Sequence, residues 1–161
     1  MKVNHVPKSR EEAASSAGAQ LVVAASKGGV ARAQLFSVAG GDQAPKRWVG
    51  HVVLITPPPG ESHEVAALVA PVLEDDPGRP WDEYFQILLL RDLFMVHEDD
   101  DLLPIHDVWQ RLRDASYAVE TLVKQRDAWE AVTGHLLAHG VVTESEARAF
   151  MVQSQSKMKP A

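Results

Sequence analysis

The sequence predicts an α+β domain, in which a small antiparallel sheet at about residues 20–56 precedes a mainly helical part. Two observations support this prediction. Strand-like runs bounded by glycine and proline occupy the first third of the chain. Apolar residues recur at spacings of three and four in much of the remainder, and the longest such stripe, from Ile105 to Leu136, predicts one long amphipathic helix at about 104–139.

The composition is that of an ordinary globular protein. A chain of 161 residues is large enough to bury a hydrophobic core without disulfide bonds. It contains no cysteine, which excludes thiol chemistry and cysteine-ligated zinc and suits a reducing compartment. Residues 1–18 lack the apolar run of a secretory signal, and no run is long enough to span a bilayer. We therefore expect a cytoplasmic protein that makes no membrane contact and needs no cofactor.

The charge distribution makes nucleic acid an unlikely partner. The formal charge is −6, and acidic residues concentrate at 74–76 and 98–101. Proteins that bind nucleic acid normally carry a basic stripe that neutralises phosphates. Here the basic residues are scattered, and most lie beside acidic ones.

A single domain is expected over residues 19–153, between a flexible N-terminal segment at 1–18 and a flexible tail at 154–161. The N-terminal segment is polar and rich in alanine and serine. Ser9 and Glu12 have the spacing of a capping box, so a short, marginal helix could begin there.

The predicted sheet begins with a strand at 20–25, followed by a turn at 27–29. Residues 30–38 fit two alternatives, because their apolar and polar residues alternate as in a strand while their alanine and glutamine content favours a short helix. The alternation favours the strand. Residues 47–56 form the clearest strand and end at the prolines 57–59.

Four helices are expected, at about residues 62–73, 81–96, 104–139 and 144–153. Ser62 is placed to cap the first helix, and Gly140 to end the third in a left-handed conformation. Thr143 and Glu146 have the capping-box spacing at the start of the fourth.

The long helix predicts an interface. At about 1.5 Å per residue it would extend roughly 45 to 50 Å, which exceeds the diameter of a compact domain of this size. Part of its apolar face would then need cover from another helix or a second subunit. The candidate interface residues are Trp109, Leu122, Trp129 and Leu136. We therefore predict a non-catalytic protein–protein interaction or assembly protein, whose partner is a second copy or another subunit.

A different function is indicated by residues 25–33, where Ser-Lys-Gly-Gly-Val follows the predicted strand. This run resembles the deviant phosphate-binding loop of the ParA/MinD-like ATPases, which continues into Gly-Lys-Thr. Here arginine and alanine stand where that family has the phosphate lysine and the magnesium-binding hydroxyl. The alternatives are a plain turn and a small ligand- or nucleotide-binding protein or accessory enzyme subunit. Its candidate ligand-binding residues are Lys27, Gly28, Gly29 and Arg32.

Two histidine-containing patterns are compatible with metal binding. The first comprises His97, Asp99, Asp101 and His106. Its spacing matches no calcium loop, and acidic residues before a helix also favour the helix dipole. The second is His135 with His139 at the spacing of zinc proteases, although Leu136 stands where those enzymes have a glutamate.

Overall fold

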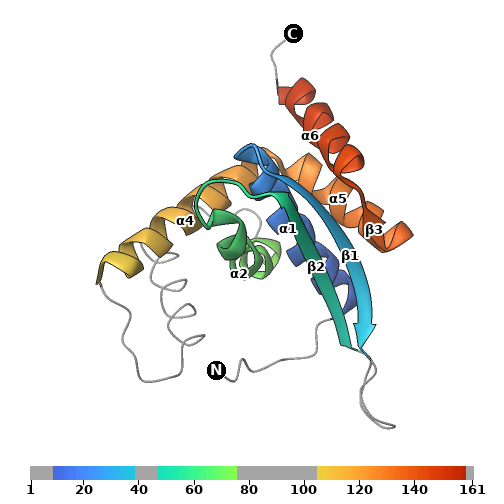
Figure 1. Ribbon diagram of the computed structural model, residues 1–161, viewed down its shortest axis with the longest axis horizontal. Coiled ribbons are helices and arrows are strands. Elements are labelled where there is room, and N and C mark those ends of the chain that lie inside the picture. Colours follow the sequence, from blue (N-terminus) through green and yellow to red (C-terminus); the bar gives the residue numbers. More distant parts are fainter. Residues whose placement is uncertain (1–8, 39–46, 76–104, 159–161) are drawn as a thin grey trace.

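The computed structural model describes residues 9–38, 47–75 and 105–158 and has the predicted α+β class (Figure 1). Its three strands are β1 (Val30–Val38), β2 (Arg47–Thr56) and β3 (Val141–Val142). They form an antiparallel sheet in the order β2-β1-β3. The described helices are α1 (Arg10–Ser26), α2 (Ser62–Asp75), α4 (Ile105–Lys124), α5 (Arg126–His139) and α6 (Glu144–Met158).

The central element is α1, which lies between the sheet and the helices α2 and α5. It begins at Ser9, whose hydroxyl accepts a hydrogen bond from the backbone N–H of Glu12 at 3.1 Å, as the capping box predicts. Every residue from Ala13 to Ala24 except Gln20 is buried. The strand predicted at 20–25 is therefore wrong, and residues 10–18, expected to be flexible, belong to a core helix.

Small residues explain why α1 can be covered on several sides. A β-carbon at Gly50 of β2 would lie 2.6 Å from both the Ala13 carbonyl oxygen and Ala17 Cβ. A β-carbon at Gly18 would lie 2.8 Å from Thr133 Oγ1 of α5. Two neighbours thus approach α1 closely, which only glycine permits at these two positions. The alanine, serine and glycine content that predicts flexibility instead allows close packing.

The sheet has one face toward α1. β1 and β2 pair from Val30↔Thr56 to Val38↔Arg47, which confirms the strand alternative for residues 30–38. Ala31, Ala33 and Leu35 point inward and are buried. β3 follows Gly140, whose φ of 77° is the left-handed conformation expected at the end of the preceding helix.

The segment expected to form one helix at 104–139 consists of two, α4 and α5, which meet at Gln125. The Gln125 N–H still donates to the Thr121 carbonyl at 2.8 Å, and the Trp129 N–H donates to the Gln125 carbonyl at 3.0 Å. Gln125 thus ends the last turn of α4 and begins the first turn of α5, and because only this one residue separates the helices, the apolar spacing continues. The bend lets α4 pack against α2 while α5 packs against α1.

The last helix, α6, begins at the predicted capping box. Thr143 Oγ1 accepts the Glu146 N–H at 3.3 Å, and Glu146 Oε1 accepts the Thr143 N–H at 3.1 Å. α6 continues to Met158 with Ser154 buried, so the helix extends beyond the expected tail boundary. The helix predicted at 81–96 lies outside the described residues. None of the described helices combines the length and the apolar character needed to cross a bilayer.

Candidate functional site

The turn at Lys27-Gly28-Gly29 ends a helix and leads into a strand. The Lys27 and Gly29 N–H groups donate to the Ala24 carbonyl at 3.2 and 2.9 Å, and the Gly28 N–H donates to the Ala25 carbonyl at 3.0 Å. A phosphate-binding loop needs free N–H groups at the start of a helix. Here the N–H groups satisfy the last carbonyls of α1. The turn is therefore a helix C-terminal cap, and the resemblance to a phosphate-binding loop does not extend to its geometry.

The side chains of this region also diverge. Lys27 Nζ donates to Ser62 Oγ at 3.1 Å and lies 4.4 Å from the centroid of the Tyr117 ring. Arg32 lies on the opposite side of the sheet layer and is exposed. The four predicted ligand-binding residues therefore do not converge on one site.

Lys27 belongs instead to a polar network that joins α1, α2 and α4 and has two buried members, Ser62 and Asp114. Ser62 Oγ donates to Asp114 Oδ1 at 3.2 Å, and Gln110 Nε2 donates to the same oxygen at 3.2 Å. Ser62 and Asp114 are only 1% and 6% exposed. A hydroxyl between an amine and a carboxylate could be an activated nucleophile. This one is closed to solvent, so the network serves to join the three helices.

The predicted metal ligands are mostly outside the described residues. His97, Asp99 and Asp101 lie there, as does the side chain of His106, whose backbone is in the first turn of α4. Within the described ranges, no group of three or more histidine, aspartate or glutamate side chains could hold a metal ion.

The second histidine pattern forms a contact between two helices. The His135 and His139 rings lie 4.4 Å apart, and His135 Nε2 pairs with Glu146 Oε2 of α6. The pKa of Glu146 is lowered, chiefly by hydrogen bonds from the backbone and side chain of Thr143 and less by the two histidines. The contact between His135 and Glu146 therefore connects α5 to α6.

Three of the four predicted interface residues lie in the core. Leu122 and Leu136 are fully buried, and Trp129 is 4% exposed. Trp129 Nε1 donates to the Ser15 carbonyl at 3.0 Å, so its one polar atom is also satisfied inside the chain. Only Trp109 is exposed, at 59%. The apolar stripe is thus covered by the chain itself in the part that the structure describes, which removes the main reason to expect an interface along it.

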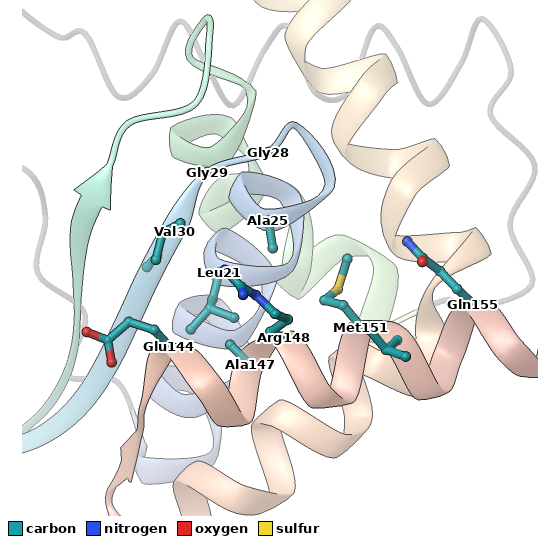
Figure 2. A pocket seen from close by; sticks show the side chains of 12 residues that line it. Leu21, Ala25, Gly28, Gly29, Val30, Glu144, Ala147, Arg148, Met151 and Gln155 are labelled. Carbon is teal, nitrogen blue, oxygen red and sulfur yellow. The ribbon is translucent and has the colours of Figure 1, made fainter.

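A cavity of about 250 Å³ lies between α6 and the α1–β1 turn (Figure 2). Leu21 and Met151 give it an apolar floor, and its charged lining residues, Glu144 and Arg148, come from α6 alone. Small-molecule sites usually measure about 300 to 1,000 Å³ and gather polar groups from several elements. The cavity is smaller and lacks that convergence, so we do not assign it a ligand.

The most exposed apolar surface of the sheet lies on the side opposite α1. We call this side the open face, because no described helix packs on it (Figure 1). Its side chains belong to Arg32, Gln34, Phe36, Val38, Arg47, Val49, His51, Val53 and Val141. Among them Phe36, Val38, Val49 and Val141 are 44%, 48%, 46% and 38% exposed. Phe36 is paired with Val49 and its ring lies 6.4 Å from that of His51, so the apolar side chains adjoin one another.

The open face is also basic. The three strands contain Arg32 and Arg47 but no aspartate or glutamate, although the whole chain has a formal charge of −6. The sequence does hold a signal for this surface, because consecutive apolar residues such as 52–55 occur where a strand with one solvated face should alternate.

Comparison of the chain with protein-family models, with curated proteins and with solved structures found no match.

Proposed function

We propose that this chain is a non-catalytic protein–protein interaction or assembly protein that binds its partner through the open face. The observation that supports the proposal is the exposure of Phe36, Val38, Val49 and Val141 on one continuous surface. The uncovered face of an antiparallel sheet is normally polar. Contiguous apolar patches on monomeric proteins commonly mark interaction sites.

The polar groups of the described residues favour binding over catalysis. The buried Ser62 hydroxyl accepts a hydrogen bond from Lys27 and donates one to Asp114, so both of its roles are taken within the chain. The backbone N–H groups of the α1–β1 turn are bonded to carbonyls of α1. The open face, in contrast, has exposed apolar side chains that no described helix covers and that can contact a protein surface.

Affinity purification of the tagged full chain from its cells of origin tests this proposal. The double variant Phe36→Glu with Val49→Glu should lose the partner, because it places two charges in the apolar centre of the open face. The matched control is Val123→Glu with Val152→Glu, which changes two similarly exposed valines, 54% and 55%, on α4 and α6.

Quantitative mass spectrometry should show one set of proteins retained by wild type and control and lost from the face variant. Circular dichroism should show that both variants remain folded. If the control loses the same proteins, or the face variant retains all of them, the proposed docking surface is wrong.

A further inference from the structure

We infer that the partner presents a protein segment with acidic side chains on both sides of an apolar centre. This inference rests on the proposed function and concerns the chemistry of the surface that the open face binds.

The two arginines of the open face lie at opposite ends of its apolar patch. Arg32 is paired with Val53, whereas Arg47 is paired with Val38, six residues farther along β1. At about 3.3 Å per residue, this separates the two positions by about 20 Å. Phe36 and Val49 lie between them. A complementary segment therefore has carboxylates about 20 Å apart, which about seven residues of extended chain or about thirteen of helix can span.

The guanidinium groups of Arg32 and Arg47 are the positive charges that such a partner would contact. Neither forms an ion pair with a residue in the described ranges. A planar guanidinium binds a carboxylate through two parallel hydrogen bonds, which adds orientation to the charge attraction. None of the three strands carries an acidic side chain that would repel such carboxylates.

The same charges argue against a second copy that docks face to face. Such a dimer would bring two basic faces together, and like charges across an interface are unfavourable. Nucleic acid is also a poorer match. Proteins that bind single strands combine a basic groove that follows the backbone with successive stacking rings, whereas the open face has two arginines about 20 Å apart and two rings, Phe36 and His51.

Fluorescence anisotropy with the full chain and four labelled probes tests the inference. Three of the probes are peptides of equal length with a central run flanked by charged residues. The first has valines flanked by glutamates, the second has valines flanked by lysines, and the third has serines flanked by glutamates. The fourth probe is oligouridine. The glutamate–valine peptide should bind at least about tenfold more tightly than the lysine–valine peptide, and its affinity should fall as NaCl rises from about 50 to about 500 mM.

Variants assign the preference to the open face. Arg32→Glu with Arg47→Glu should reverse the preference toward the lysine–valine peptide, whereas Arg32→Lys with Arg47→Lys should keep the original order. The control Arg113→Glu changes an exposed arginine on α4 and should leave all affinities unchanged. Equal binding of both charged peptides, tighter binding of oligouridine, or an unchanged preference in the double glutamate variant would overturn the inference.

The two proposals fail differently. Suppose that purification with Phe36→Glu and Val49→Glu loses a partner while Arg32→Glu with Arg47→Glu retains it. Then the open face is the docking surface, and the acidic character of the partner is wrong. If neither double variant changes the proteins retained, the docking surface itself is wrong.

Discussion

Ser62 shows how a single hydroxyl can join distant parts of this chain. It accepts a hydrogen bond from Lys27 and donates one to Asp114, and it is almost fully buried. Ser62→Ala should lower the free energy of unfolding by about 1 to 3 kcal/mol, because the buried Asp114 carboxylate loses a donor. Urea denaturation measures this change. Ser145→Ala, at an exposed position of α6, should change stability by less than about 0.5 kcal/mol. Equal effects of the two substitutions would contradict the structural role of Ser62.

Two glycines should respond in opposite directions to the same substitution. Gly50→Ala places a β-carbon 2.6 Å from α1 backbone and should destabilise the protein by about 1 to 3 kcal/mol. Gly134, inside α5, has nothing within 4 Å of an added β-carbon. Gly134→Ala should therefore stabilise the protein by up to about 1 kcal/mol. Thermal unfolding of both variants checks the signs, and a neutral Gly50→Ala would mean that α1 does not approach β2 this closely.

Local features of single residues are predictable from the sequence here, and distant ones are not. The caps at Ser9, Thr143 and Gly140 depend on neighbours within a few positions, so their spacing identifies them. The hydrogen bond from Ser62 to Asp114 joins residues 52 positions apart, and no local sequence pattern predicts it.

At the scale of elements, the contact between α5 and α6 should depend on pH. Hydrogen bonds from Thr143 and the nearby histidines lower the pKa of Glu146 below its ordinary value of 4.5. A lowered pKa in the folded state means that the stabilisation is present above the ordinary value and is lost as pH falls through the folded value. Glu146→Gln should therefore reduce stability most near neutral pH.

Urea denaturation between about pH 7 and about pH 3 tests this dependence. The stability difference between wild type and Glu146→Gln should shrink toward the acidic end. Glu144→Gln serves as the matched control, because it removes a carboxylate from the same helical turn outside the contact with His135. A difference that stays constant across the range would show that Glu146 titrates no differently in the folded and unfolded chains.

The spacing of apolar residues predicts some helices and strands correctly and others wrongly, for physical reasons. The strands 30–38 and 47–56 are predictable because β1 alternates between a buried and an exposed side. α1 is buried on nearly all sides, so it has no polar face. Its alanine, serine and glycine content is also typical of a flexible segment, which is why the sequence does not predict a core helix. α4 and α5 share one continuous apolar stripe, because Gln125 alone separates the two helices.

At the scale of the whole molecule, Trp129 stabilises the chain's own fold. Trp129→Ala should lower the free energy of unfolding by about 3 to 5 kcal/mol, because it leaves a cavity between α5 and α1. Trp109→Ala, at a position 59% exposed, should cost less than about 0.5 kcal/mol. Urea denaturation compares the two. A small loss for Trp129→Ala together with weakened association would restore the interface expected from the sequence.

The sequence predicts an interface on the helices, whereas the exposed apolar surface lies on the sheet. Which apolar residues are buried depends on the packing of the whole fold. The sequence identifies a large apolar stripe but not the elements that bury it. Bending at Gln125 and the central position of α1 provide that cover inside the chain. The sheet instead has an apolar side on which none of the described helices packs, with Phe36 and Val49 at its centre.

Photo-crosslinking tests the central claim most directly. A photoreactive phenylalanine analogue is placed at Phe36 in the open face or, as the control, at Val123 on α4, which is similarly exposed. After irradiation in living cells, the account predicts a protein adduct of one defined mass from position 36 and none of that mass from position 123. An adduct from position 123 alone, or the same adduct from both positions, would contradict the assignment of the open face as the docking surface.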